Sequence, residues 1–260
     1  MQILSEIENN YPENLRGFKR FILREYLQHK LLQIIFESEY ANKLCFLGDT
    51  CLRIVHGNKR FSEDLDFDNF NIGEDAFEKV SLVLKKQLEL EGYEVDMKTV
   101  YKGAYHCYIR FPEILYREGL SGHREEKILI QLDTEPQHFD FVPEKYILNR
   151  FDVFTQIFIT PLEILLAQKF YTVCNRARNK GRDFFDIVFL LSLVSKPNYD
   201  YLKLKLDVSN ADQLKEKILD RCNQIDMEEM ARDVVPFLFD TKDLKKIILF
   251  PELIIQAKLY

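Results

Sequence analysis

The segment RFSEDLDF at residues 60–67 places acidic residues inside an apolar stretch whose alternation is typical of a β-strand. Side chains two residues apart in a strand point to the same face, about 7 Å from one another. Asp64 and Asp66 therefore share one face. The other face carries Glu63 among three large apolar residues, which indicates that this face is mostly buried. The fold must therefore accommodate two neighbouring carboxylates on a strand with a buried side.

Two carboxylates side by side repel one another and raise each other's pKa, so keeping both ionised requires a cation. Magnesium is the usual cation where the substrate is a nucleotide. A D-x-D triplet also arises by chance in an acidic chain, and this chain has a net charge of -6. Asp133 is a third candidate ligand, because it ends the apolar strand KILIQLDTEP at residues 127–136. The alternative is a strand-end aspartate that begins a turn before Pro136.

A glycine turn precedes these acids. The segment KLCFLGDT, residues 43–50, is a short apolar strand that ends at Gly48 and leads into a short helix. A glycine at a strand-to-helix turn lets the backbone approach a phosphate, and the N–H groups that begin the helix favour an anion. Gly48, Asp49 and Thr50 occupy this turn, about sixteen residues before the D-x-D triplet. The turn and the triplet together indicate a nucleotide site.

The combined segment FLGDTCLRIVHGNKRFSEDLDF resembles a motif of the AbiEii/AbiGii toxin family, nucleotidyltransferases related to DNA polymerase β. The residues that match are Gly48, Thr50, Leu52, Arg53, Gly57, Arg60, Ser62, Asp64, Leu65, Asp66 and Phe67. Asp49 departs from the motif, because the family has a second glycine there and the wider superfamily a serine. An aspartate beside a triphosphate is unfavourable unless its side chain turns away or meets a cation. Asp49 is therefore expected to affect which nucleotide binds and, to a lesser degree, whether the protein is active.

After residue 160 the pattern changes to helices, and the change begins with a helix-start signal. Thr160 is the expected N-cap, Pro161 the first helical residue and Glu163 the end of a capping box. We therefore divide the chain into a core with N-terminal helices, residues 1–159, and a helical region, residues 160–260. The resemblance implies an α+β fold: a polymerase-β-like nucleotidyltransferase core, with a mixed sheet and flanking helices, followed by an all-α C-terminal region.

Periodicity predicts the individual elements. Helical spacing predicts one long or two shorter helices over residues 12–36 and a helix over residues 76–90. The expected strands are residues 43–47, 60–67, 92–101, 104–111 and 127–136, with a weaker candidate at 152–159. Beyond the first C-terminal helices, further helices are expected near residues 211–222, 226–239 and 241–258.

The segment PLEILLAQKFYTVCNRARNKGRDFFDIVFLLS resembles the family's lysine-bearing helix followed by an R-D-x-x-D helix. Lys169 interrupts an apolar stripe, so its side chain either snorkels to solvent or reaches a buried anion. Asp183 and Asp186 lie on one face near the start of the second helix, where the helix dipole also favours acids. A basic run here either grips phosphates or forms a solvated loop. It comprises Arg176, Arg178, Lys180 and Arg182.

The resemblance implies a metal-dependent reaction in which a nucleoside monophosphate passes from an NTP to an acceptor hydroxyl. Asp64 and Asp66 would bind two Mg²⁺ ions, and Asp133 would help to hold one of them and draw the proton from the hydroxyl. Lys169 would neutralise charge on the phosphates, and Asp183 would orient Lys169 or a neighbouring arginine. The nucleotide site implied by the family comprises Gly48, Asp49, Thr50, Arg53, Ser62 and Lys169.

By the same resemblance the protein would be the toxin of a toxin–antitoxin or phage-defence pair, with a cognate antitoxin as partner. The acceptor would be RNA, with the 3′ end of tRNA as the first choice. The net charge of -6 argues against a surface that binds nucleic acid throughout, so RNA contacts would be confined to basic patches. One patch is the basic run just described. The other, on the first long helix, comprises Arg16, Lys19, Arg20 and Arg24.

Two alternatives to RNA modification stay open at this point. The transfer could modify a protein or a small molecule, as antibiotic nucleotidyltransferases of the superfamily do. The chain could also be a catalytically degenerate member that binds a nucleotide without reaction, and Asp49 is the residue that supports this alternative.

The sequence also predicts a compartment. The N-terminal segment lacks a basic stretch followed by a long apolar run, so no signal peptide is expected, and no window of roughly eighteen apolar residues predicts a membrane span. The five cysteines are scattered and include no C-x-x-C pair, which favours free thiols in a reducing compartment. We therefore expect a cytoplasmic protein without a membrane partner.

Overall fold

The computed structural model describes residues 2–260 and divides the chain into two compact units. The first unit extends to Gly57 and resumes over Phe61–Ile159. The second consists of Asn58–Arg60 and Thr160–Tyr260. The short segment Asn58–Arg60 therefore folds with residues that follow it by about a hundred positions in the chain.

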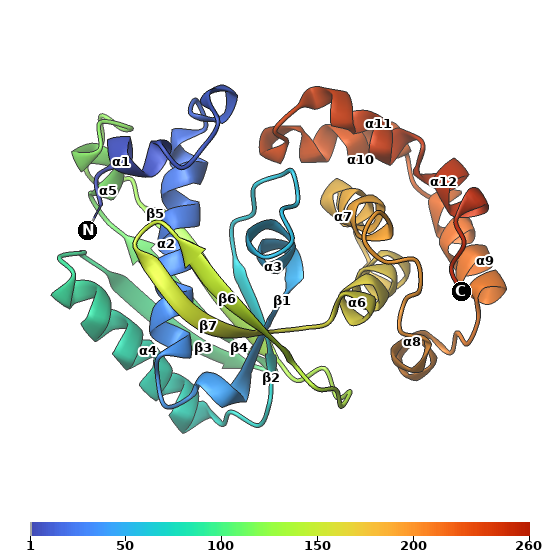
Figure 1. Ribbon diagram of the computed structural model, residues 1–260, viewed down its shortest axis with the longest axis horizontal. Coiled ribbons are helices and arrows are strands. Elements are labelled where there is room, and N and C mark those ends of the chain that lie inside the picture. The colour runs from blue at the N-terminus through green and yellow to red at the C-terminus, as the bar shows by residue number, and fades with distance from the viewer. Residues whose placement is uncertain (1) are drawn as a thin grey trace. The chain divides into compact units, whose positions relative to one another are not determined.

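The first unit is built on a seven-stranded mixed sheet with the strand order β3-β4-β5-β2-β1-β7-β6 (Figure 1). Its strands are β1 (Leu44–Leu47), β2 (Leu65–Asn69), β3 (Asp96–Lys102), β4 (Ala104–Phe111), β5 (Ile128–Glu135), β6 (Glu144–Arg150) and β7 (Val153–Ile159). The pairs β2–β5 and β1–β7 are parallel, and the other neighbouring pairs are antiparallel. This mixed sheet confirms the predicted α+β class.

Helices flank the sheet. They are α1 (Leu4–Glu8), α2 (Lys19–Phe36), α3 (Gly48–Ile54), α4 (Glu74–Leu90) and α5 (Ile114–Arg117). Contacts of α2 with β5 and β7, and of α4 with β3 and β4, place these two long helices over one face of the sheet. The apolar stripe of α4 is buried there, and consists of Phe77, Val80, Leu84 and Leu88. On β4 and β5 the side chains that face these helices include the buried Cys107, Ile109, Ile130 and Leu132, whereas Asp133 and its registered partner Asp66 lie on the other face.

The second unit is all helical beyond its first segment. Its helices are α6 (Leu162–Asn175), α7 (Gly181–Leu191), α8 (Tyr199–Leu206), α9 (Ala211–Cys222), α10 (Met227–Val234), α11 (Lys245–Ile248) and α12 (Phe250–Gln256). The helix α7 contacts α6, α10 and α11, so it lies at the centre of this unit. Its buried face includes Phe184, Phe185 and Ile187. The helical C-terminal region is as predicted.

The strand expected at residues 60–67 begins later, at Leu65. The residues before it bond to side chains instead of a neighbouring strand: the Ser62 carbonyl accepts from Gln28, and the Asp64 carbonyl accepts from the Thr50 hydroxyl. Side chains from α2 and α3 thus replace the ladder partners that a longer strand would need.

The predicted capping box at Thr160 is wrong. The helix α6 begins at Leu162, Pro161 is its N-cap residue, and no side chain caps it. A residue before proline favours an extended backbone, so Thr160 does not turn into the helix. The strand β6 was not among the predicted elements, because its apolar residues Tyr146, Ile147 and Leu148 are consecutive and do not alternate with polar ones.

Among residues 2–260, none of the helices combines the length and apolar character that spanning a bilayer requires.

Candidate active site

Asp66 and Asp133 are directly opposite one another on the parallel strands β2 and β5. Registered partners on neighbouring strands point to the same face, and the strands lie about 4.8 Å apart. Asp64 precedes β2, and its Oδ1 accepts a hydrogen bond from the Gln131 backbone N–H at 3.4 Å. The three carboxylates predicted from sequence therefore lie at adjacent positions of the sheet, on the face that α2 and α4 leave uncovered.

The Asp133 carboxylate is held by two polar neighbours. His106 on β4 is registered opposite Asp133, and its Nδ1 lies 2.7 Å from Asp133 Oδ1. The Gln131 side-chain amide donates to both carboxylate oxygens at 2.8 and 2.9 Å. Neither partner was predicted. The available signal was the alternation in AYHCYIRF, which places His106 on the face opposite Cys107 and Ile109.

Asp64, Asp66 and Asp133 together form what we call the carboxylate row. Their oxygens fit magnesium, which prefers carboxylate ligands. In the part of the chain that the structure describes, no group of three or more Asp, Glu, His or Cys side chains is arranged to hold a metal ion. Magnesium is usually held by only one or two carboxylates together with substrate phosphates and water. Asp66 and Asp133 can supply these two carboxylate ligands, because they are neighbours on one face of the sheet.

The glycine turn at residues 48–50 packs against the side chain of Asp66. Gly48 has φ +78, and a Cβ built on it would lie 2.5 Å from Asp66 Oδ2. Any other residue would be strained by this φ and would also push the carboxylate away. Asp49 lies in the first turn of α3, where the helix dipole favours an acid.

Thr50 and Ser62 are buried and bond to each other, with the two hydroxyl oxygens 2.8 Å apart. Their side chains tie the start of α3 to the segment that leads into β2. A nucleotide contact from these two residues would therefore come from their backbone groups.

Arg53 is engaged with a buried acid. Its guanidinium donates to both oxygens of Glu25 on α2, with Nε–Oε2 and Nη2–Oε1 distances of 2.7 and 3.2 Å. Arg150 and Tyr11 also donate to Glu25 Oε1, each at 2.8 Å. Burial opposes ionisation of Glu25, but the guanidinium groups of Arg53 and Arg150 outweigh it and lower the pKa below its usual range. Arg53 therefore anchors α3 to α2 from inside the protein.

The basic residues near the first long helix also have partners within the protein. Arg24 pairs with Glu63 at 2.7 Å, which explains why Glu63 points away from the other two acids. Lys19 pairs with Glu8 and Arg20 with Glu126, and the Arg16 Nε donates to the Tyr11 carbonyl.

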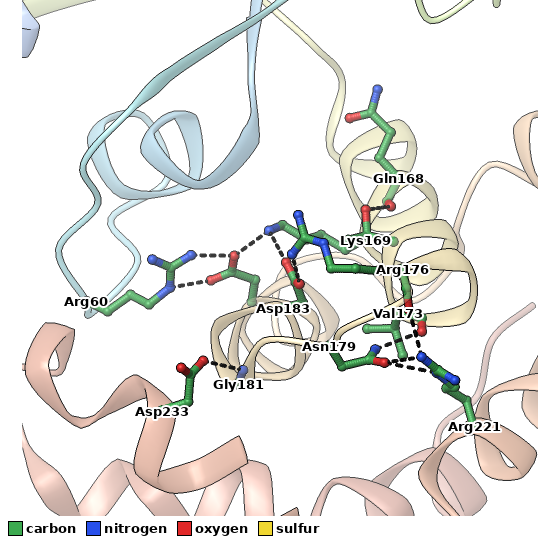
Figure 2. Close-up of polar contacts among 12 residues, drawn as sticks. Arg60, Gln168, Lys169, Val173, Arg176, Asn179, Gly181, Asp183, Arg221 and Asp233 are labelled. Carbon is green, nitrogen blue, oxygen red and sulfur yellow. Dashed lines mark hydrogen bonds and ion pairs between the residues drawn. The ribbon is translucent and has the colours of Figure 1, made fainter. Parts of the chain in front are cut away.

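The second unit contains a cluster of charged side chains built around α6 and α7 (Figure 2). Lys169 Nζ lies 3.2 Å from Asp183 Oδ1 and 2.8 Å from Asp186 Oδ2. Arg176 contacts the other Asp183 oxygen at 2.6 Å. Of the two possibilities for Lys169, the structure therefore shows contact with buried anions.

Arg60 completes this charge cluster. It donates to both oxygens of Asp186, with Nε–Oδ1 and Nη2–Oδ2 distances of 2.7 and 2.6 Å, and Asn58 donates to Oδ1 at 2.8 Å. Two carboxylates thus face three cations, Arg60, Lys169 and Arg176, so these five side chains together carry one positive charge. Arg60 was matched to the family motif but was not predicted to bond to Asp186.

The loop between α6 and α7 is held by other helices of the same unit. Arg221 on α9 donates to the buried Asn179 Oδ1 at 2.9 and 2.6 Å and to the Arg176 carbonyl at 2.7 Å (Figure 2). Asp233 accepts from the Gly181 N–H at 3.0 Å. The predicted basic run is thereby divided: Arg176 points into the charge cluster, Arg182 is half-buried, and Arg178 and Lys180 are exposed.

Residues 30–248 match the sequence model of a family described as nucleotidyl transferase AbiEii toxin of type IV toxin–antitoxin systems. The chain belongs to this family. The match includes the carboxylate row, the glycine turn and the Lys169 cluster, and it confirms the resemblance found from the sequence motifs. The AbiEii family is one of nucleotidyltransferase toxins.

Solved structures share the fold of this AbiEii-family chain. The protein JHP933 from Helicobacter pylori superimposes with a TM-score of 0.54 at 17% identity, over 91% of this chain and 92% of that one. A second Helicobacter pylori protein, described as a candidate nucleotidyltransferase, has a TM-score of 0.53 at 17% identity and covers 90% of this chain and 94% of its own. No curated protein sequence matches the chain. These likenesses support the predicted nucleotidyltransferase fold.

Proposed function

We propose that this AbiEii-family chain transfers a nucleoside monophosphate from an NTP to a hydroxyl group of RNA, with magnesium as cofactor. The 3′ end of tRNA is the proposed acceptor, and the setting is a toxin whose activity a cognate antitoxin protein restrains in the cytoplasm. The observation that carries the proposal is the registered pair Asp66 and Asp133, with Gly48 packed directly against Asp66.

The first unit would supply the chemistry. Asp64 and Asp66 would hold magnesium, with Asp133 as a further ligand, and the bound ion would neutralise phosphate charge and acidify the attacking hydroxyl. Asp133 would accept the hydroxyl proton, because a carboxylate held by His106 and Gln131 is kept in a fixed orientation. The backbone of the Gly48–Thr50 turn would seat the triphosphate.

Positive charge for phosphates would come from Lys169 and from the loop between α6 and α7. Lys169 belongs to a cluster with more cations than carboxylates, and Asp183 holds both Lys169 and Arg176 in place. We assign phosphate binding to Lys169 and an orienting role to Asp183. Arg178 and Lys180, which are exposed on a loop that Arg221 holds, would contact RNA phosphates.

The test is transfer of labelled nucleotide. The purified protein is incubated with each α-labelled NTP, total RNA and Mg²⁺, and RNA and protein are separated before counting. We expect label in RNA, no transfer in EDTA, and a fall of at least about 100-fold for Asp66→Asn and Asp133→Asn. Glu63→Gln is the matched control, because Glu63 is a neighbouring acid that pairs with Arg24 on the other side.

Each outcome of this assay bears on a different part of the proposal. Label in protein or in small molecules, with RNA unlabelled, would contradict the RNA acceptor. Absence of magnesium-dependent pyrophosphate release from every NTP would contradict catalysis itself and favour a nucleotide-binding role. Sequencing RNA 3′ ends after expression of the parent and of Asp66→Asn in a bacterium identifies the acceptor.

A further inference from the structure

The sheet face that carries Asp133 continues across β4 and β3 as a polar and aromatic surface. In register with Asp133 is His106, and the next row along the strands joins Gln131, Tyr108 and Lys98. These three side chains point to the same side as Asp133, because registered partners share a face. The opposite face of β4 is buried, with Cys107, Ile109 and Phe111 at 0% exposure. On β4, the accessible face is therefore the one continuous with the carboxylates.

Tyr108 is the central aromatic residue of this face. Its ring is half-exposed, the His106 ring centroid lies 6.4 Å away, and the Arg110 guanidinium carbon lies 5.7 Å from the Tyr108 ring centroid. The three side chains form a row along β4 in which an aromatic ring stands between two groups that can stack or carry charge. Aromatic rings on an open sheet face are a recurring platform for unstacked nucleic-acid bases.

The charges beside Tyr108 are positive. Lys98 and Lys102 on β3 are exposed and Arg110 is half-exposed, and none of the three has an ion-pair partner among residues 2–260. The acid of the outer row, Asp96, is already paired with Lys127 at 3.0 Å. Away from the carboxylate row, this face therefore complements an anion such as a phosphodiester backbone.

We infer that this face binds the single-stranded 3′ end of the RNA acceptor, with a terminal base stacked on Tyr108 and backbone phosphates on Arg110 and Lys98. The inference rests on the proposed function and adds a substrate surface to it. Tyr108 is two residues from His106, so the base would lie about 7 Å along the strand from the row that contains Asp133. A distance of about 7 Å allows one terminal nucleotide to stack its base on Tyr108 and to place its 3′ hydroxyl at Asp133.

The strand order favours the acceptor over the NTP at this place. The Gly48 turn follows β1, Asp66 lies on β2, and Asp133 and Tyr108 follow on β5 and β4. Asp66 therefore lies between the proposed triphosphate seat and the Tyr108 face. In-line displacement needs the attacking oxygen opposite the leaving pyrophosphate. A nucleotide that enters from the β4 side meets this requirement.

Binding of a short RNA tests the inference without any transfer reaction. The probe is a single-stranded RNA of about eight nucleotides with 5′ fluorescein and a free 3′ hydroxyl, titrated with the full chain in EDTA at low salt. We expect Tyr108→Leu to weaken binding about tenfold, the loss of one stacked base, and Tyr108→Phe to bind like the parent. Arg110→Gln should make the negative slope of log K against log salt concentration shallower by about 0.7.

Tyr116→Leu is the matched control, because Tyr116 is 41% exposed and has the Arg124 guanidinium over its ring at 5.0 Å, but lies on α5 away from this row. An RNA affinity unchanged in Tyr108→Leu, or no binding of the probe by the parent, would overturn the inference. A raised KM for NTP with unchanged RNA affinity would place the nucleotide substrate on Tyr108 and overturn the acceptor assignment. The proposed function is tested separately, in the nucleotide-transfer assay. It fails if Asp66→Asn transfers nucleotide at the parent rate.

Discussion

Arg60 and Asp186 are 126 residues apart in the chain and form a two-point ion pair inside the second unit. The two side chains are 1% and 0% exposed. Without Arg60, the buried Asp186 keeps its contacts with Lys169 and Asn58 but loses two hydrogen bonds from a charged donor. We therefore expect Arg60→Met to lower the free energy of unfolding by about 3 to 5 kcal/mol, measured by urea denaturation.

Arg232→Met is the control for this prediction. Arg232 pairs with Asp226 at 3.9 Å, with both side chains more than half exposed, and such surface pairs contribute about 0 to 1 kcal/mol. Equal losses in the two variants would show that burial does not distinguish the pairs.

Gly48→Ala should harm both stability and nucleotide transfer. Gly48 and Gly57 have nearly the same backbone angle, φ +78 and +77, so alanine costs about 1 to 2 kcal/mol at either place. Only Gly48 has a neighbour in the way, because its Cβ would lie 2.5 Å from Asp66 Oδ2. We expect transfer to fall at least about tenfold in Gly48→Ala and to stay at the parent rate in Gly57→Ala. Equal rates in the two variants would argue against a contact between the turn and the carboxylate in the working enzyme.

The stability of the fold should fall as the pH is lowered through the range in which His29 titrates. Burial lowers the pKa of the His29 imidazole from 6.5 to about 4. The unfolded chain therefore binds a proton at higher pH than the folded chain, and stability is lost as the pH falls from about 6.5 to 4. Between pH 7 and pH 4.5 the parent should lose about 2 kcal/mol more than His29→Gln, by urea denaturation. A loss of the same size in both proteins would mean that His29 is protonated in the fold.

Reversal of the exposed charges on the α6–α7 loop should weaken RNA binding. Arg178 and Lys180 are exposed, so glutamate at both positions changes the surface and leaves the buried cluster intact. The negative slope of log K against log salt concentration should become shallower by about 1.4, which is 0.7 for each lost phosphate contact. Reversal of Lys242 and Lys245, two exposed lysines of the same unit, makes the same charge change elsewhere. If both double variants lose affinity equally, net charge and not the loop determines binding.

Local patterns predicted much of the site. Period-two alternation placed Asp133 at the end of an apolar strand, and the structure puts it opposite Asp66 in the parallel pair. Helical spacing placed Lys169 on an apolar stripe, and its ammonium group is buried against Asp183. These predictions depend on side chains that share a strand or a helix face, which the repeat of the backbone determines.

Partners from distant segments could not be predicted in the same way. His106 reaches Asp133 because β4 and β5 pair in one particular register, and a shift by a single residue would turn His106 to the buried face. The Arg53–Glu25 pair likewise depends on how α3 packs against α2. Arg53 was expected to contact a nucleotide, whereas in the structure its guanidinium donates to both carboxylate oxygens of the buried Glu25.

The sequence by itself determined the α+β class, the family, the positions of most strands and helices, and the acidic and basic residues available for chemistry. Only the tertiary structure decided which of these residues meet: Arg60 with Asp186, His106 with Asp133, and Gly48 with Asp66. The physical reason is that backbone periodicity acts over a few residues, whereas strand register and helix packing depend on burial of apolar side chains across the whole unit.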